Sequence, residues 1–323
     1  MNDLLAGVLD AHGGVDRWAR VHTITAHLSI GGPFWGRKGW GEIFGEQTTL
    51  ELDTRREHIV VTPFTGLDRR SVFDVNPERI VVDTNDGVAV ERRDDPRASF
   101  AGYEITTPWD ALQVGYFISY ACWNYLTAPF LFTYPGVETR ELEPWQEDGE
   151  TWRRLHVTFP RSIATHSTEQ VFYYGADFMQ RRMDYAVEVN GDVLVAQYQY
   201  EPKTFHGLVF PTQRRVHRRN ADGTAEQSQT SITLDITEIA IDSDEPPSST
   251  HRDTSTRGQS GIGPYEPVGH RARGVTDGTA RARPTRRHDT TGDASHHADD
   301  SADPGISLSP RTTLPEEVIT CTY

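Results

Sequence analysis

The chain has 323 residues, 36% hydrophobic and 24% charged, which is long enough for one or two domains and too polar for an integral membrane protein. Its formal net charge of -15 argues against a nucleic-acid-binding surface. The two cysteines, Cys122 and Cys321, and the absence of a CxxC pattern exclude a disulfide framework and a cysteine zinc site, and we expect no cofactor and no metal site.

The N-terminal segment predicts a helix, because Leu4, Leu5, Val8 and Leu9 follow helical spacing directly after Asp3. It contains no basic stretch leading into a long apolar run, so we expect no secretory signal. The resulting expectation is a cytoplasmic protein, monomeric by default.

Short alternating segments predict strands through most of the first 242 residues. In residues 23–30, apolar side chains alternate with polar neighbours. Further strands are predicted at residues 48–53, 57–62, 79–83, 88–92, 152–159, 168–174, 178–189, 193–201, 208–216 and 231–241. Asn85-Asp86-Gly87 and Asn190-Gly191 predict tight hairpins, because these residues tolerate a positive φ. The pattern predicts one large antiparallel sheet, which has to curl, close or be covered.

A glycine- and tryptophan-rich segment, residues 31–41, follows the first strand. It lacks the GxxxxGK[ST] spacing of a phosphate loop. Two interpretations stay open: a mobile aromatic lid over the mouth of the sheet, or an ordinary long hairpin whose glycines meet turn geometry.

The strand pattern is interrupted from about Pro108 to Pro135, and no charged residue occurs between Asp110 and Glu138. Both faces of the predicted helix are apolar: one carries Trp109, Leu112, Tyr116, Tyr120 and Trp123, and the other Ala111, Val114, Ile118, Cys122 and Tyr125. Such a helix is buried on several sides. Its prolines, tyrosines and polar residues argue against a membrane span, so we expect it to lie in the hollow of the sheet.

The composition changes after Asp242. Residues 243–323 contain only two of the 32 aromatic residues, Tyr265 and Tyr323, and such a segment buries too little apolar surface to offset its ordering entropy. We therefore expect a globular domain at residues 1–242 and a disordered low-complexity tail at 243–323. The His296-His297 pair within the tail has no scaffold that would make it a metal site.

The opening Ala11-His12-Gly13-Gly14-Val15-Asp16-Arg17-Trp18 and the following Val21-His22-Thr23-Ile24 resemble the start of LolA-like proteins, the outer-membrane lipoprotein-sorting superfamily. Four further segments resemble uncharacterised soluble relatives of that group: residues 61–66, 96–102, 144–153 and 165–170. The resemblance covers residues 1–242. It implies a mainly β (α+β) fold: a strongly curved, open antiparallel half-barrel with helices on its concave face and an apolar pocket, but not the lipoprotein cargo.

Aromatic side chains supply the candidate ligand-binding residues, because binding pockets are typically apolar with a few polar groups. The candidates are Phe34, Trp35, Trp40, Phe117, Tyr120, Trp123, Tyr125, Phe130 and His166. The same residues could equally fill the core between helix and sheet.

Catalytic patterns are sparse, since GxSxG, HExxH and GxGxxG are all absent. His166, Glu169 and Tyr173, or Asp110 and His27, could approach one another, but period-two alternation puts His166 and Glu169 on opposite sides of a strand. Four adjacent arginine pairs place one arginine on each face: 69–70, 153–154, 181–182 and 214–215. An inward member of a pair would suit a carboxylate or phosphate headgroup.

Three functions remain open. The first is the binding of a hydrophobic or amphipathic small molecule, such as a lipid or a polyketide-like metabolite, favoured by an apolar cavity. The second is a pocket enzyme of cyclase, isomerase or hydrolase type, favoured by buried ionisable groups facing a cavity, because positioning alone accelerates such steps. The third is a non-catalytic interaction module, favoured by a filled core.

Overall fold

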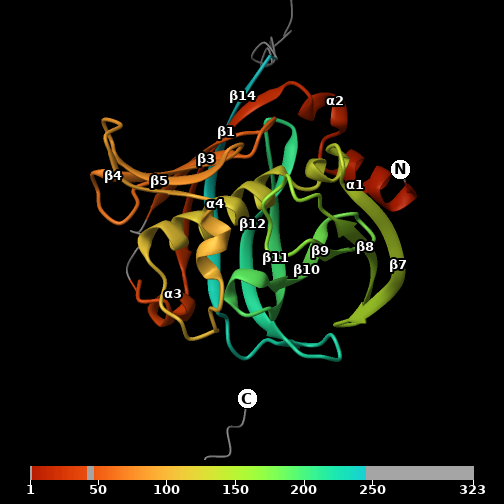
Figure 1. The fold of residues 1–323 in the computed structure, drawn as a ribbon. Coiled ribbons are helices and arrows are strands. Elements are labelled where there is room, and N and C mark those ends of the chain that lie inside the picture. The colour runs from red at the N-terminus through yellow and green to blue at the C-terminus, as the bar shows by residue number, and fades with distance from the viewer. Residues whose placement is uncertain (1, 42–46, 245–323) are drawn as a thin grey trace, which may run out of the picture. The chain divides into compact units, whose positions relative to one another are not determined.

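The computed structural model describes residues 2–41 and 47–244 (Figure 1). Six short helices of the described residues accompany the long central one. Three are α-helices, α1 (Asp3–Ala11), α2 (Val15–Trp18) and α3 (Pro33–Arg37), and three are 3-10 helices, η1 (Pro96–Phe100), η2 (Phe130–Thr133) and η3 (Glu188–Asn190). The central helix is α4 (Ala111–Thr127). The predicted tail, apart from Ser243 and Asp244, lies outside the described residues, as does the His296-His297 pair.

Fourteen strands in the described residues belong to one antiparallel sheet (Figure 1). They are β1 (Val21–Gly31), β2 (Thr48–Asp53), β3 (His58–Thr62), β4 (Arg69–Val75), β5 (Glu78–Thr84), β6 (Ala89–Asp94), β7 (Glu138–Glu147), β8 (Glu150–Thr158), β9 (Glu169–Tyr174), β10 (Gln180–Val187), β11 (Val193–Phe205), β12 (Leu208–Arg219), β13 (Ala225–Glu226) and β14 (Ile232–Ser243). Their order is β6-β5-β4-β3-β2-β1-β14-β12-β11-β10-β9-β8-β7, with β13 paired to β12.

The topology consists of two meanders joined by one long-range pairing. Strands β1–β6 follow one another in the sheet, as do β7–β12, because tight turns connect antiparallel neighbours. The last strand, β14, lies between β1 and β12 and joins the halves, with Ile24 opposite Ile241 and Val216 opposite Ile232. Residues more than 200 positions apart in the sequence therefore lie side by side.

The prediction of a mainly β protein with an antiparallel sheet is confirmed. The sheet is neither closed nor strongly curled, so the predicted half-barrel is wrong in its curvature. In the described part of the chain, β6 and β7 remain the two ends of the strand order. Helices cover the apolar face instead, which removes that face from water without closing the sheet.

Three strands escaped the sequence pattern: the two-residue β13, which is too short to show a period, and β4 and β7. Most side chains of β7 are partly or fully exposed, because it is an edge strand, so it has no apolar alternation. In β4 only Ser71 and Phe73 are buried, and charged residues surround them. The predicted hairpins are confirmed: β5 pairs with β6, and Gly191, with φ at +67°, lies in the turn between β10 and β11.

The segment after the first strand differs from both expectations. Residues 33–37 form a helix with Pro33 in its first turn, where the missing N–H costs nothing. Phe34 and Trp35 on this helix are buried. In this structure they are therefore packed residues of the core, not part of an open lid or a plain hairpin.

Candidate functional site

The central helix α4 positions the site, and its start is defined by a capping box. The Asp110 carboxylate accepts a hydrogen bond from the Gln113 N–H, and the Gln113 side chain accepts one from the Asp110 N–H, both at 2.9 Å. This reciprocal arrangement satisfies two otherwise unpaired donors of the first turn. All residues of α4 are buried, which confirms the predicted central helix, although its cap was not foreseen.

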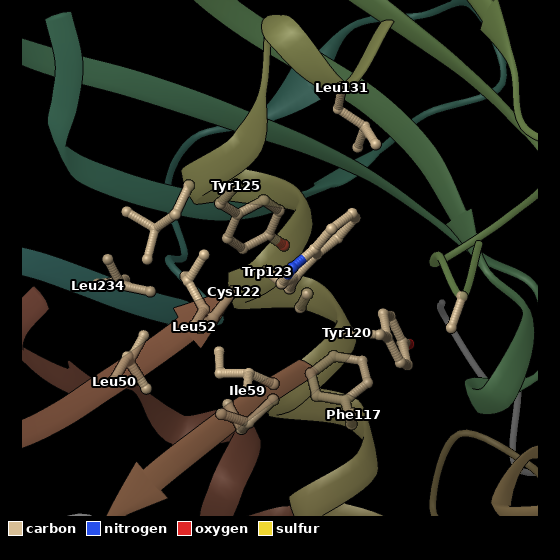
Figure 2. Packing of buried hydrophobic residues seen from close by; sticks show 14 of the residues in the cluster. Leu50, Leu52, Ile59, Phe117, Tyr120, Cys122, Trp123, Tyr125, Leu131 and Leu234 are labelled. Atoms are coloured by element: carbon tan, nitrogen blue, oxygen red, sulfur yellow. The ribbon is translucent and has the colours of Figure 1, made fainter. Parts of the chain in front are cut away.

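Strands from both halves of the sheet contact α4. On one side Gly115 packs closely, because an added Cβ would lie 3.3 Å from Phe64 and 3.4 Å from Ile80, a tight contact. Tyr116 packs edge-on against Phe73 of β4. Figure 2 shows the other side, where Cys122 faces Leu234 of β14. The helix thus has no free face.

Four aromatic rings meet at the N-terminal end of α4. Phe34 lies 5.0 Å from Trp35, 5.4 Å from Trp109 and 5.6 Å from Phe117, measured between ring centroids. Trp40, another predicted residue, is only partly buried, and its indole N–H donates to the Trp109 carbonyl at 2.7 Å. The structure therefore brings four predicted residues together, namely Phe34, Trp35, Trp40 and Phe117. Trp109 joins them, although it was not among the predicted ligand-binding residues.

His166 forms the polar centre of the site. Its Nδ1 lies 3.2 Å from the Tyr120 hydroxyl and its Nε2 lies 2.8 Å from the Tyr125 hydroxyl. Tyr125 in turn lies 3.2 Å from the hydroxyl of Tyr185, on β10. Burial, and to a smaller extent the nearby charge of Arg97, lowers the pKa of His166 to about 3. The imidazole is therefore neutral at pH 7.

A buried arginine lies beside this centre. Arg214 is 3% exposed, and its guanidinium donates to Gln197 Oε1 and to the Tyr125 carbonyl, both at 3.1 Å. Its Nε has no hydrogen-bond partner, and no carboxylate of the described residues forms an ion pair with it. Burial lowers the pKa of Arg214 to about 10, so it carries its charge at pH 7. Buried charges are ordinarily paired.

The neighbouring Arg215 lies on the opposite face of β12 from Arg214, because side chains alternate along a strand. Arg215 points to the other face of β12, where its guanidinium forms an ion pair of 2.6 Å with Asp235. The prediction that a member of an arginine pair points inward is therefore confirmed for Arg214. It is not confirmed for Arg182, which is fully buried but on the outer face of the sheet.

Two small cavities adjoin Arg214 and Tyr125. The larger, of about 30 Å³, is lined by Ile30, Trp35, Phe117, Ile118, Ala121, Cys122, Tyr125, Tyr185, Gln197, Arg214, Val216, Ile232 and Leu234. The smaller, of about 10 Å³, lies beyond Tyr125, near Phe132 and Met183. A space of this size holds about one water molecule. The site is closed in this structure.

Two predicted residues lie away from this centre. Trp123 is buried on the far side of α4, where its indole N–H donates to the Asp53 carbonyl at 2.8 Å. Phe130 stacks on Trp18 with ring centroids 4.6 Å apart. Of the nine predicted residues, only Trp35, Phe117 and Tyr125 line the larger cavity.

A charged group reaches the site from the surface. Arg97, on η1, donates to the Tyr116 hydroxyl at 3.1 Å and to the Thr165 carbonyl, and pairs with Glu188 at 2.9 Å. Its guanidinium lies 5.8 Å from the Tyr120 ring. Sequence patterns gave no reason to select Arg97, because its partners come from distant segments.

The proposed catalytic groupings do not assemble. Glu169 lies on the exposed rim beside His156, and Tyr173 donates to Asp184 at 2.8 Å on the outer face, so neither joins His166. His27 and Asp110 have separate partners, Thr49 and Arg93. Within residues 2–41 and 47–244 no cluster of histidine, cysteine, aspartate and glutamate could hold a metal ion.

The fold and site define an open antiparallel β-sheet protein built around a buried helix. No described helix is long and apolar enough to cross a membrane. No family model matches the chain, and no curated protein matches its sequence.

Several solved structures are similar. A DUF1329 family protein from Desulfovibrio piger is 13% identical, with a TM-score of 0.41, and the match covers 75% of this chain and 94% of that one. A LolA superfamily protein from Nitrosomonas europaea is 10% identical, with a TM-score of 0.36 and the same coverage. An outer membrane lipoprotein-sorting protein domain from Vibrio parahaemolyticus is 10% identical, with a TM-score of 0.33 and coverage of 72% and 91%. These neighbours are of the kind that the sequence resemblance indicated.

Proposed function

We propose that this protein binds an amphipathic small molecule whose carboxylate or phosphate group contacts Arg214 and whose apolar part lies between α4 and the sheet. The observation that carries this proposal is the buried guanidinium of Arg214, which has an unpaired Nε and no described carboxylate partner. A buried cation without a counter-ion is costly, and an anionic ligand group would supply the missing charge.

The lining beside Arg214 suits the apolar part of such a ligand. Trp35, Phe117 and Leu234 provide apolar surface, whereas Tyr125 and Gln197 add hydrogen-bonding groups near the charge. Binding sites commonly combine a mainly apolar wall with a few polar groups that orient the ligand. The particular lipid or metabolite, the cytoplasmic location and the monomeric state stay predictions.

Ligand entry requires the site to open. Drug-sized ligands occupy roughly 300–1,000 Å³, whereas the larger cavity has about 30 Å³. Trp35 is the only lining residue on α3, the five-residue helix between β1 and β2. A short helix outside the sheet opens at a smaller free-energy cost than a strand in mid-sheet. Displacement of α3 is therefore the expected route of entry.

The alternative of a pocket enzyme has less support. Ionisable groups do face the cavity, but an effective general acid or base has a pKa near the working pH. Burial lowers the pKa of His166 to about 3 and raises that of Tyr125 to about 12. Groups that keep their protonation state at pH 7 support recognition by hydrogen bonds and a fixed charge rather than proton transfer.

Matched ligands and matched variants test the proposal. Oleate and oleyl alcohol share a chain and differ in the anionic group, so binding of both to the full-length protein is measured by isothermal titration calorimetry. We expect Arg214→Gln to weaken oleate binding by about tenfold or more, because a charge-assisted hydrogen bond contributes about 1.5–3 kcal/mol. Arg215→Gln, on the other face of the same strand, should leave it unchanged.

Two results would overturn the proposal. One is no saturable binding of either ligand by the unsubstituted protein. The other is equal oleate affinity in the Arg214→Gln and Arg215→Gln variants. Circular dichroism and thermal denaturation of both variants establish that each is folded before binding is compared.

A further inference from the structure

A second hollow lies on the outer face of the sheet, opposite the Arg214 cavity. On β10, Met183 and Tyr185 point into the core, so Arg182 and Asp184 point to the other face by the alternation of a strand. This hollow has a volume of about 480 Å³ and extends over β8–β12. That volume lies in the range of small-molecule sites, unlike either core cavity.

Tyr173 and Asp184 form the floor of the hollow and belong to a buried, hydrogen-bonded cluster with Arg182 and Glu147, which do not line it. Arg182 donates to Asp184 from Nε at 2.6 Å and from Nη2 at 2.8 Å, and its Nη1 pairs with Glu147 at 2.7 Å. The Tyr173 hydroxyl donates to Asp184 Oδ2 at 2.8 Å. Arg182 therefore pairs with the carboxylates of both Asp184 and Glu147, so its guanidinium is not available to a ligand.

Two further arginines line the hollow from opposite sides. Arg154, on β8, lies with its guanidinium 5.9 Å from the Tyr173 ring, and its Nε donates to the Glu143 carbonyl at 2.6 Å. Arg219, on β12, has its Nε 3.6 Å from Asp184 Oδ2, too long for a hydrogen bond, and that Nε is buried without a hydrogen-bond partner. Both side chains thus reach toward the Tyr173–Asp184 pair.

The charges around the hollow balance, although the whole chain is strongly acidic. Three guanidinium groups, those of residues 154, 182 and 219, face two carboxylates, those of residues 147 and 184. Two more carboxylates line the hollow: Glu188 is neutralised by Arg97 at 2.9 Å, and Glu169 is 71% exposed at the rim, 3.8 Å from His156. With Arg97 counted, four guanidinium groups meet four carboxylates, so an anionic group would be attracted by the buried, unpartnered Nε of Arg219 rather than by an excess of positive charge.

We propose that this outer hollow is a second binding site, which takes a small polar molecule through a carboxylate or phosphate group held by Arg154 and Arg219. Ser167 and Thr168, which also line the hollow, supply hydroxyl groups suited to the polar remainder of that molecule. This site differs from the Arg214 cavity, with which it shares only Tyr185, because its lining includes two arginines and it is open on one side.

Inorganic phosphate and citrate serve as the probes and distinguish the two oxyanion chemistries. The full-length protein is labelled with 15N in its tryptophan indoles, and each probe is titrated at constant ionic strength. The Trp145 signal reports locally, because its ring lies 5.7 Å from the Arg154 guanidinium, and Trp145→Phe assigns it. We expect a saturable shift with at least one probe, and the tighter of the two identifies the ligand group.

Matched variants connect the shift to the two arginines. Arg154→Gln and Arg219→Gln should each weaken the binding by about tenfold, the loss of one charge-assisted contact. Arg153→Gln, which removes only the ion pair to Glu141, and Arg218→Gln, an exposed neighbour, should not change it. Arg182 is left intact, because its removal would destabilise the floor.

Two outcomes overturn the inference: no saturable shift of the Trp145 signal with either probe, or equal affinity in the Arg154→Gln and Arg153→Gln variants. Arg214→Gln should bind the probes normally, whereas Arg154→Gln should bind oleate normally. Failure of one site in this comparison is therefore distinguishable from failure of the other.

Discussion

His166 and Tyr185 stack face to face, with ring centroids 4.1 Å apart and an angle of 11° between the ring planes. The stack joins the loop before β9 to β10 and covers one face of the imidazole. The hydroxyl groups of Tyr120 and Tyr125 are hydrogen-bonded to the two ring nitrogens. The imidazole is thereby removed from water, which is the physical cause of its low pKa.

This burial predicts a dependence of stability on acid. Below about pH 6.5 the unfolded chain takes up a proton on His166, whereas the folded protein does so only near pH 3, so the free energy of unfolding falls as pH drops through this window. Between pH 7 and pH 5 this group alone accounts for about 2 kcal/mol. His166→Gln should remove that part of the difference, as measured by urea denaturation at both pH values.

The control is His206→Asn, an exposed residue at a positive φ that asparagine tolerates. The stability of His206→Asn should depend on pH in the same way as that of the unsubstituted protein. The prediction is wrong if His166→Gln and His206→Asn show the same loss of stability from pH 7 to pH 5.

Glu57 predicts the opposite dependence of stability on pH, namely a loss of stability as pH rises. Its carboxyl is buried: one oxygen accepts a hydrogen bond from the Ala164 N–H at 2.8 Å, and the other has no hydrogen-bond partner. Burial raises the pKa of Glu57 well above the ordinary value. The charge of Glu78 also raises this pKa, whereas Arg97 lowers it. The folded protein therefore keeps a proton that the unfolded chain releases above about pH 4.5, and stability from this group is lost as pH rises.

Glu57→Gln should consequently gain stability relative to the unsubstituted protein at pH 8 and lose this advantage toward pH 4.5. Thermal unfolding across that range measures the difference. Glu51→Gln, at an exposed position of β2, should show no such trend. A constant offset between Glu57→Gln and the unsubstituted protein at every pH would contradict the assigned pKa direction.

Arg182 and Arg181 predict very different costs of removal. Arg182→Met removes the cation that is hydrogen-bonded to the buried Asp184 and the partly buried Glu147, which should destabilise the protein by about 3–5 kcal/mol. Arg181 forms its ion pairs with Asp177 and Glu150 at a partly exposed position, so Arg181→Met should cost about 1 kcal/mol or less. Urea denaturation of the two variants gives the comparison, and equal costs would refute the structural role of Arg182.

Cys122 provides a chemical probe of the closed site. It is a free, buried thiol that lines the larger cavity, and burial raises its pKa to about 12. In a Cys321→Ser background, the native protein should react with a thiol reagent at pH 8 orders of magnitude more slowly than the urea-unfolded chain, because the thiolate is the reactive form. Rapid labelling of the native protein would show that the site opens far more readily than its packing indicates.

The periodic segments of the chain were predictable, and the reason is local. Alternation in residues 23–30 predicted β1, because a half-buried strand imposes a period of two. The uncharged run after Asp110 predicted a helix buried on several sides, and Asn190-Gly191 predicted a hairpin. Each of these signals depends on a few consecutive residues.

The candidate site was predictable only in its composition. Phe34, Trp35 and Phe117 were selected as aromatic residues, yet nothing in the sequence placed Trp109 among them. His166 was selected, but its stacking partner Tyr185 was not. These contacts join segments that the chain separates widely, and the order of strands in the sheet decides them.

The sequence by itself determined that residues 214 and 215 occupy opposite faces of a strand, because side chains alternate. Only the tertiary structure decided that Arg214 points toward α4 while Arg215 meets Asp235 on the other face. The physical reason is that a period of two is symmetric between the two faces. The pairing of β12 with β14, and the helix packed against one side, break that symmetry and leave a buried positive charge at the centre of the molecule.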